Sequence, residues 1–266
     1  MRVSVASESG REDGRNEDWA GATATSAVVL DGLSEGPETG CVHGTPWYVR
    51  QLGERLLALA GNFSLPLADA LSEAIRGVAR LHEESCDLNH PGSPCSTVAL
   101  LRQRRDAVDY LVLSDSTIVI DRASDPVVIT DKSVDSVAQE KAAAATAVTD
   151  KNDKKALNAL IEEQQRVRNR EGGYWVAQVD PAASDHARTG TLGDVRGAAL
   201  LSDGAALLVT DFHVLDWGTL LTLGYERGPS EIIAMTREFE DRDPNGAIWP
   251  RYKHRDDASA VICMMP

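Results

Sequence analysis

The chain has few cysteines, and none of them stands in a pattern that holds zinc or builds a disulfide framework. Among 266 residues there are four cysteines with no C-x-x-C pair: Cys41, Cys86, Cys95 and Cys263. Structural zinc sites and disulfide-rich domains both depend on recognisable cysteine spacing. We therefore expect reduced, mostly buried thiols, with neither a zinc site nor disulfide bonds.

Basic residues are also scarce relative to acidic ones. The chain has 27 Lys and Arg against 41 Asp and Glu, a formal net charge of −14. Nucleic acids and anionic membranes attract basic surfaces. The charge therefore argues against nonspecific binding to a nucleic acid or to a membrane.

Long apolar runs are missing as well. The N-terminal segment from Met1 to Glu8 lacks the apolar core of a secretion signal. No stretch approaches the roughly 20 apolar residues of a membrane span. From these absences we expect a cytoplasmic protein.

Two well-known catalytic signatures do not occur. The sequence has no G-x-S-x-G, which presents a serine nucleophile, and no G-x-x-x-x-G-K-[ST], which cradles the phosphates of a nucleotide. These absences argue against a serine hydrolase of the nucleophile-elbow type and against a P-loop nucleotidase.

What the chain does have is a set of apolar, strand-like runs that end in an acidic residue and a small one. Three such runs end at Asp31-Gly32, Asp115-Ser116 and Asp203-Gly204, and acidic pairs also occur at Glu17-Asp18 and Asp256-Asp257. A carboxylate at the end of a buried strand is costly unless a cation meets it. Mg²⁺ and Mn²⁺ prefer oxygen ligands that converge from different segments. The pattern predicts a hydrolytic site with paired metal ions.

Hydrophobic periodicity predicts a mixture of strands and helices. After a first strand near 27–31 we expect helices over 48–60 and 67–84, strands over 96–101, 108–113 and 117–121, a helical insert, a strand that ends at 203, helices over 214–223 and 229–240, and a last strand over 258–264. This order predicts an α+β sandwich in which helices pack outside antiparallel sheets. We expect one domain over 1–266, with a helical or flap-like insert at about 131–197.

The ordered acidic motifs resemble those of the metal-dependent protein phosphatases, the type 2C serine/threonine phosphatases. In that family a Glu-Asp pair precedes a strand ending in Asp-Gly, followed by a Gly-Asp-Ser turn, a Ser-Asp-Gly turn and a C-terminal Asp-Asn or Asp-Asp strand. The corresponding positions here are Glu17-Asp18, Asp31-Gly32, Asp115-Ser116, Asp203-Gly204 and Asp256-Asp257. The resemblance implies a four-layer α-β-β-α sandwich of two antiparallel sheets flanked by helices.

The resemblance also implies a site, residue by residue. Asp31 would bridge two Mn²⁺ or Mg²⁺ ions, the carbonyl of Gly32 would bind one of them, and Asp203 and Asp257 would complete the pair. Asp18 would orient water on the ions or bind directly, and Asp115 would hold a weaker third ion. The catalytic set is then Asp18, Asp31 and Asp203. Two such ions acidify a shared water and neutralise phosphoryl oxygens, so no covalent nucleophile is required.

Some positions depart from the family pattern. Leu33-Ser34-Glu35 stands where the family often has a residue followed by two glycines, and Leu33 stands where some members carry a histidine acid. The family's phosphate-binding arginine position falls on Asp13, with Arg11 and Arg15 on either side; we select Arg15 for that role. The motif around Asp115 lacks the usual preceding glycine.

The implied function is hydrolysis of phosphoserine and phosphothreonine in proteins. The expected partners are phosphoprotein substrates and the kinase whose action the enzyme would reverse. One alternative keeps the site but acts on a small phosphorylated metabolite. Another is a catalytically weak regulatory or binding module, motivated by the changed residues after Asp31 and the displaced arginine. Metal affinity would separate this module from an enzyme.

Overall fold

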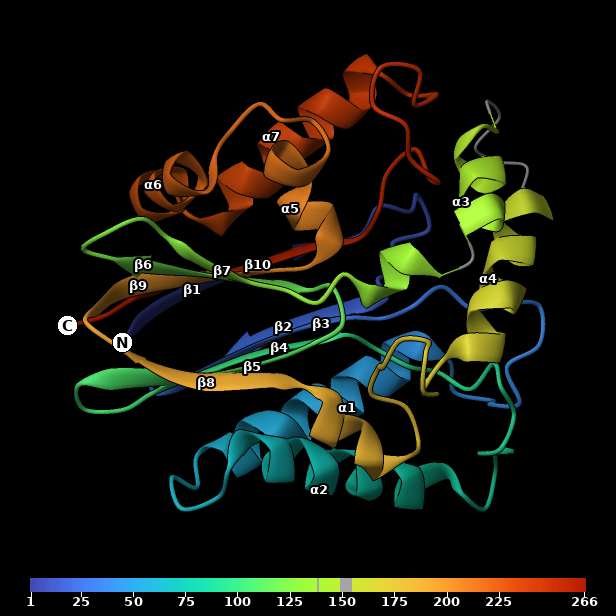
Figure 1. Ribbon diagram of the computed structural model, residues 1–266, viewed down its shortest axis with the longest axis horizontal. Helices are drawn as coiled ribbons and strands as arrows, with labels where there is room; N and C mark the ends of the chain where they lie inside the picture. Colours follow the sequence, from blue (N-terminus) through green and yellow to red (C-terminus); the bar gives the residue numbers. More distant parts are fainter. Residues whose placement is uncertain (138, 149–154) are drawn as a thin grey trace.

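The four residues from Ala27 to Leu30 are fully buried because their strand, β3 (Ser26–Asp31), lies inside a stack of two sheets. The computed structural model describes residues 1–137, 139–148 and 155–266. Over those residues, two five-stranded antiparallel sheets face each other and helices cover their outer sides (Figure 1). This arrangement confirms the predicted α-β-β-α sandwich.

The first sheet joins the two ends of the described chain. Its strand order is β1 (Arg2–Glu8), β10 (Ala258–Met264), β9 (Val195–Leu201), β6 (Thr117–Arg122) and β7 (Val127–Ile129). On its outer face lie α5 (Asp203–Thr210), α6 (Trp217–Arg227) and α7 (Pro229–Arg242). Side chains such as Leu208, Leu220 and Ile232 fill the space between these helices and the sheet.

The second sheet has the order β2 (Asp18–Ala22), β3, β4 (Val98–Gln103), β5 (Ala107–Leu113) and β8 (Arg188–Gly193). Its outer face is covered by α1 (Thr45–Ala60) and α2 (Leu67–His82). In α2, Leu71, Ile75 and Val78 repeat at three- and four-residue steps and are fully buried. This burial is what an amphipathic helix on a sheet requires.

A third apolar layer lies between the sheets. Because side chains alternate along a strand, Val29 and Leu101 face inward to meet Ile118 and Leu200 of the other sheet. Both chain termini lie at one end of this sandwich, and the insert helices lie at the other (Figure 1).

The insert is partly helical, as its composition predicts. It contains a 3₁₀ turn, η1 (Ser133–Ser136), the helices α3 (Gln139–Thr146) and α4 (Lys155–Val167), and a second 3₁₀ turn, η2 (Pro181–His186). The predicted range of about 131–197 also includes β8, a strand of the second sheet, so the excursion away from the sheets is shorter than predicted. Residues 138 and 149–154 of that range lie outside the described residues.

Several elements differ from the sequence prediction. Helix α5 follows β9 directly, in a place where only a turn was predicted, and α6 begins at Trp217 instead of Val214. Strand β1 was missed because it is a mostly exposed edge strand without an apolar run. In the part of the chain that the structure describes, no helix is both long enough and apolar enough to cross a membrane.

Candidate metal and phosphate site

Asp18 and Asp31 occupy matching positions on neighbouring strands. Asp18 begins β2, Asp31 ends β3, and the two residues are direct partners in the antiparallel ladder. Antiparallel pairing places the start of one strand beside the end of the next. The two predicted site residues therefore lie together at one end of the second sheet.

The first sheet brings two more aspartates to the same end. Asp203 is the first residue of α5, one residue after the end of β9, and Asp257 immediately precedes β10, the neighbour of β9. The main-chain N–H of Asp203 donates to Oδ2 of Asp31 at 3.3 Å, a contact between the two sheets. The sandwich thus brings together residues that are up to 239 positions apart in the sequence, from Asp18 to Asp257. The pairing of β2 with β3 places Asp18, and the hydrogen bond from the Glu17 N–H places Asp257.

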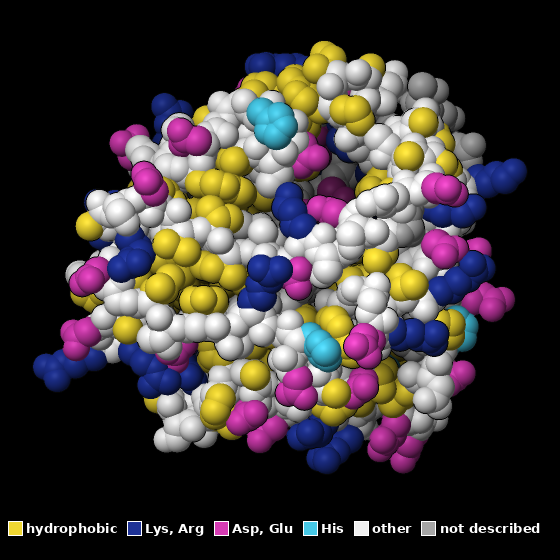
Figure 2. Space-filling model, viewed as in Figure 1, with side chains coloured by type: hydrophobic (Ala, Val, Ile, Leu, Met, Phe, Trp, Pro, Cys, Tyr) yellow, Lys and Arg dark blue, Asp and Glu magenta, His cyan; other side chains and the backbone are white. Residues whose placement is uncertain are grey.

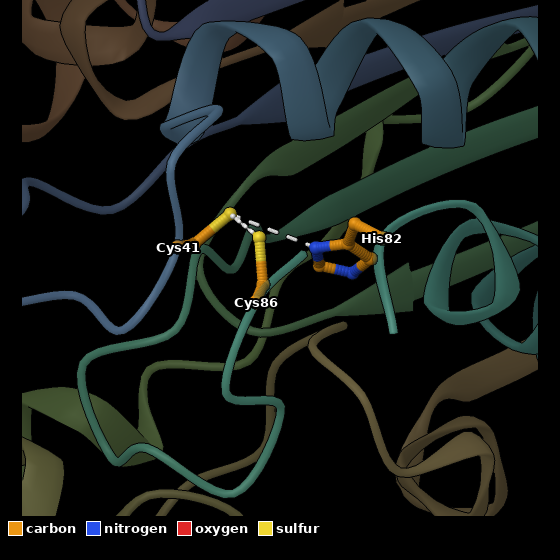
Figure 3. A group of neighbouring side chains, drawn as sticks. All are labelled: Cys41, His82 and Cys86. Carbon is orange, nitrogen blue, oxygen red and sulfur yellow. Dashed lines mark hydrogen bonds between the residues drawn. The ribbon is translucent and has the colours of Figure 1, made fainter. Parts of the chain in front are cut away.

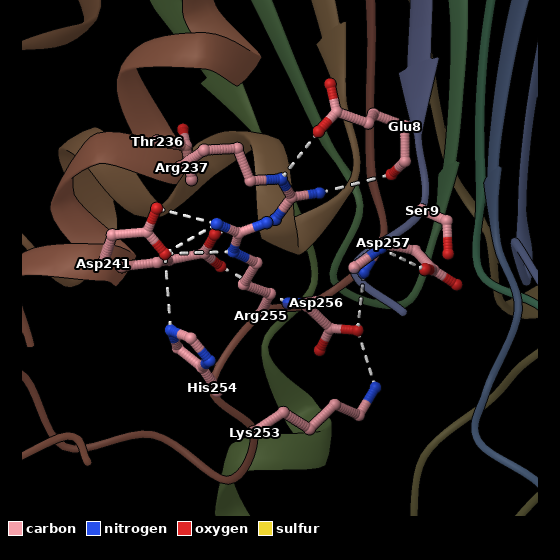
Figure 4. A network of polar contacts seen from close by, with 12 residues as sticks. Glu8, Ser9, Thr236, Arg237, Asp241, Lys253, His254, Arg255, Asp256 and Asp257 are labelled. Carbon is pink, nitrogen blue, oxygen red and sulfur yellow. Dashed lines mark hydrogen bonds and ion pairs between the residues drawn. The ribbon is translucent and has the colours of Figure 1, made fainter. Parts of the chain in front are cut away.

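The two adjacent acids before β10 have different surroundings (Figure 4). The Asp257 carboxylate accepts main-chain N–H groups from Gly10 at 2.8 Å and from Glu17 at 2.6 Å. Asp256 instead lines the pocket together with Asp203, and its Oδ1 accepts a hydrogen bond from Lys253 Nζ at 2.6 Å. Of the two, Asp256 is the one that faces the pocket.

Two glycines allow the backbone to pass close to these acids. A Cβ on Gly32 would lie 2.3 Å from the carbonyl oxygen of Glu17, and one on Gly204 would lie 2.1 Å from the carbonyl oxygen of Asp257. Both distances are far below van der Waals contact. The Asp-Gly order in these motifs therefore has a steric cause.

Burial and mutual repulsion raise the pKa values of these acids. Burial raises the pKa of Asp31 well above its usual range, and the nearby charges of Asp203 and Asp18 raise it further. Burial likewise raises the pKa of Asp18, with Asp203 and Asp257 adding to the effect. Asp203 is exposed toward the pocket but surrounded by protein on its other sides; this desolvation and the charge of Asp256 raise its pKa to about 6. Carboxylates held in this way favour a bound cation.

Asp115 joins the site from the turn between β5 and β6. It lines the same pocket as Asp203, and burial together with the charge of Asp203 raises its pKa to about 7. Its position at the turn that links the two sheets agrees with the predicted neighbourhood of the site. Whether it holds a third ion stays a prediction.

A pocket of about 500 Å³ opens above these acids. Figure 2 shows the hollow on this face, with acidic side chains inside it. Its walls come from α5, from the segment around Lys253, and from the insert, and include Val134, Val137, Ala142, Gln164 and Tyr174. Leu33, which stands in place of a histidine, also lines it.

Arg15 lies beside two glutamates. Its Nη2 is 2.5 Å from Glu35 Oε2 and 3.4 Å from Glu17 Oε1, and Glu35 also accepts the N–H of Thr45 at 2.5 Å. Glu35, at a position where the family often has glycine, therefore connects Arg15 to the start of α1. The Arg15 side chain is 40% exposed, so a phosphate group can still approach it.

The described residues fit divalent cations. Asp18 Oδ2 is buried without a hydrogen-bond partner, although such atoms normally have one, and the buried Glu17 Oε1 has only the ion pair with Arg15 Nη2 at 3.4 Å. Within the described residues, no three of these acids bring ligand oxygens within 4.8 Å of one another.

Solved structures share this architecture over their full length. Serine/threonine phosphatase Stp1 from Staphylococcus aureus aligns with a TM-score of 0.63 at 12% identity, covering 100% of this chain and 95% of that one. The Mycobacterium tuberculosis phosphatase PstP aligns with a TM-score of 0.62 at 15% identity, covering 99% and 98%. This is the fold of the type 2C serine/threonine phosphatases.

A type 2C structure with metal is also among the matches. The catalytic domain of PstP in complex with two manganese ions aligns with a TM-score of 0.58 at 14% identity, covering 99% of this chain and 97% of that one. The sequence itself matches no protein family model and no curated protein. The likeness to the type 2C phosphatases is therefore one of fold.

Two residues of the site were missed by the sequence analysis. Asp256 was noted only as the neighbour of Asp257. Successive side chains of an extended segment point to opposite sides, which is a signal that only one of these two adjacent acids faces the pocket. Lys253 had no motif to mark it. It faces the acids only because the segment before β10 folds back over the pocket.

Proposed function

We propose that this chain is a metal-dependent phosphomonoesterase that removes phosphate from serine and threonine side chains of proteins. The observation that carries the proposal is the meeting of acids from both sheets beside one pocket: Asp18 pairs with Asp31, Asp31 accepts the main-chain N–H of Asp203, and Asp203 lines the pocket together with Asp256. The type 2C fold supports it independently, since the solved structures that share this fold are serine/threonine phosphatases.

Two Mn²⁺ or Mg²⁺ ions would be held by Asp31, the carbonyl of Gly32, Asp203 and Asp256. Divalent ions supply a hydroxide nucleophile at neutral pH and neutralise the phosphoryl oxygens. Asp257, named as a ligand from the sequence, would instead fix the segment that carries Glu17, since both of its oxygens accept main-chain N–H groups. Asp18 would orient water, and Asp115 would hold a weaker third ion.

Cationic side chains would bind the substrate's phosphate. Arg15 keeps this role in the proposal, with Glu35 and Glu17 fixing its guanidinium. Lys253 is a second cation close to the acids, and its pKa is raised by the charges of Asp256, Asp203 and Asp31 against the effect of burial. It would therefore stay protonated near the phosphoryl oxygens.

Phosphoproteins are the proposed substrates because the solved structures that share this fold are serine/threonine phosphatases. A kinase that adds the same phosphates would be the functional counterpart. The kinase and the cytoplasmic location rest on the sequence alone.

A small phosphorylated metabolite is the second candidate substrate. The insert walls the pocket, and its volume of about 500 Å³ lies within the range of small-molecule sites. A protein substrate would need to enter between the insert and α5 or reach the acids from the side of Arg15. Comparing substrates of different size tests this directly.

The experiment measures phosphate release from a phosphothreonine peptide and from p-nitrophenyl phosphate, with Mn²⁺, Mg²⁺ or EDTA. We expect release that requires metal and that favours the peptide. The variant Asp203→Asn removes one charge at nearly constant shape and should abolish release. Glu54→Gln is the matched control, because Glu54 is an exposed acid on α1 that pairs only with Arg50 among the contacts described.

The outcomes separate the alternatives. A preference for small phosphoesters over the peptide would favour the metabolite phosphatase. Metal binding by calorimetry without turnover of either substrate would favour the regulatory module. Release that persists in EDTA or in Asp203→Asn would contradict the metal mechanism.

A further inference from the structure

A second cluster of metal-ligating side chains lies outside the acidic pocket. Cys41, His82 and Cys86 bring their ligand atoms within 4.8 Å of one another (Figure 3). The Cys41 and Cys86 sulfurs are 3.2 Å apart, and Cys41 Sγ is 3.6 Å from His82 Nδ1. No zinc site is predicted from the sequence, because these residues are not closely spaced along the chain.

The cluster is built from two segments that are fixed by other contacts. His82 is the last residue of α2, and the N–H of Cys86 donates to its carbonyl at 2.9 Å, so the two side chains come from one tight turn. Cys41 comes from the loop between β3 and α1, where its N–H donates to Thr39 Oγ1 at 3.2 Å. The His82 ring is 2% exposed and packs against Trp47, with ring centroids 5.2 Å apart.

The distances suit a tetrahedral Zn²⁺ ion. Zinc bonds of about 2.3 Å to sulfur and 2.0 Å to nitrogen place a sulfur about 3.5 Å from a nitrogen and two sulfurs about 3.8 Å apart. The Cys41–His82 separation of 3.6 Å is already close to this value, and the sulfurs at 3.2 Å need to part by about half an ångström. A disulfide would need them to approach by more than that, to about 2.05 Å.

The surroundings favour the forms that bind metal. Main-chain N–H groups point at the sulfurs, including that of Val42, which donates to Cys86 Sγ at 3.4 Å. Thiolates and neutral imidazoles are the usual zinc ligands in proteins.

We propose that Cys41, His82 and Cys86 supply three ligands of a Zn²⁺ site that ties the loop after Asp31 to the end of α2. The same loop carries Gly32 and Glu35. At its far end, the N–H of Thr45 donates a hydrogen bond to Glu35 Oε1. The zinc ion therefore holds in place the chain segment that supports Arg15 and the acidic pocket, without taking part in hydrolysis.

The first test measures zinc in the full chain, purified from zinc-supplemented cells without chelators. We expect about one zinc per chain, and a loss of nearly all of it in Cys41→Ser and in Cys86→Ser. Cys95→Ala is the matched control, because Cys95 is a buried thiol outside the cluster. Asp203→Asn is a second control, which should keep its zinc because the acidic pocket is separate. Equal zinc in the wild type and the cysteine variants would overturn the proposal, as would a folded wild type without zinc.

A second measurement uses the wild type alone and does not depend on whether the variants fold. Bound zinc should protect Cys41 and Cys86 from alkylation, and a strong chelator should expose both, as mapped by mass spectrometry. Replacement by Co²⁺ should give a thiolate-to-cobalt absorption band. Recovery of the pair as a Cys41–Cys86 disulfide from zinc-supplemented cells would overturn the proposal. None of these measurements depends on phosphatase activity, so they stand whether or not the proposed function does.

Discussion

Asp257 accepts the main-chain N–H of Glu17 at 2.6 Å, so a residue at the start of β10 fixes the segment that leads into β2. Its other oxygen accepts the N–H of Gly10 at 2.8 Å. The neighbouring Asp256 points into the pocket, where Lys253 contacts it. Asp257 therefore holds the backbone around Gly10 and Glu17, and Asp256 faces the pocket.

This division predicts different results for the two acids. Asp257→Ala leaves two main-chain N–H groups without an acceptor and should cost roughly 2–4 kcal/mol of unfolding free energy. Asp256→Asn should change stability by less than about 1 kcal/mol, because its ion pair with Lys253 is partly exposed. It should nevertheless lower metal-dependent hydrolysis by ~100-fold or more. Urea unfolding and phosphate release measure the two effects. Unchanged Mn²⁺ affinity in Asp256→Asn would count against Asp256 as a metal ligand.

Metal removal should expose the repulsion among the acids. In EDTA, Asp203→Asn should unfold at a higher temperature than the wild type, by roughly 2–4 °C, because one of several mutually repelling charges is gone. Added Mn²⁺ should raise the melting temperature of the wild type and leave that of the variant nearly unchanged. Thermal unfolding with and without Mn²⁺ measures both. A variant that is less stable than the wild type in EDTA would show that the repulsion is already relieved in the metal-free protein.

Lys253 should compete with metal for the acids. Its ammonium group contacts Asp256, and its pKa is raised by Asp203 and Asp31 as well. Lys253→Met removes that competing charge and should tighten Mn²⁺ binding severalfold while raising the KM for a phosphopeptide. Calorimetry and steady-state kinetics give the two numbers. Weaker Mn²⁺ binding in this variant would mean that Lys253 positions Asp256 instead of competing for it.

Arg15 should contribute to substrate binding more than Arg11 does. Arg15 is held by Glu35 and Glu17, whereas Arg11 contacts Glu17 alone among the acids described, at 3.3 Å. Loss of a charge-assisted hydrogen bond to phosphate in Arg15→Ala should raise the KM about tenfold, equivalent to ~1.4 kcal/mol, with a smaller change in kcat. Arg11→Ala is the matched comparison. Equal KM values in the two variants would count against Arg15 as the phosphate ligand.

Asp109 gives a prediction about pH. Burial would raise its pKa, but hydrogen bonds from Arg102, Thr191 and Arg104 outweigh that effect and lower it. A lowered pKa adds stability that is complete above the ordinary value of 3.8 and is lost as the pH falls through the lowered value. Asp109→Asn should therefore cost about 3 kcal/mol at pH 7, because it leaves the buried Arg102 unpaired.

The difference between Asp109→Asn and the wild type should narrow as the pH drops below 4, as followed by urea unfolding at a series of pH values. Arg104→Ala is the control, since its side chain is 41% exposed and its loss should cost less than about 1 kcal/mol. A difference that stays constant down to acid pH would argue against an ionised Asp109 as the source of the stability.

Much of the fold could be predicted because its signals are local. The three- and four-residue repeat in α2 and the apolar run of β3 depend on short windows, and both elements occur where the sequence placed them. Edge strands such as β1 and β8 carry no such run, because most of their residues are exposed to solvent or only half-buried. Helix α5 was missed because its uniformly apolar sequence has no periodicity.

The sequence by itself determined which chemistry is present: acids that end apolar strands, glycines that follow them, and an order of motifs that matches one family of folds. Only the tertiary structure decided which atoms meet. In the folded chain Asp256 lines the pocket, whereas Asp257 accepts a main-chain N–H group. Lys253 contacts Asp256, and the side chains of Cys41, His82 and Cys86 lie within 4.8 Å of one another. The physical reason is that ligand sites depend on distances of a few ångströms between distant segments, and those distances are fixed by sheet pairing and packing of the whole chain.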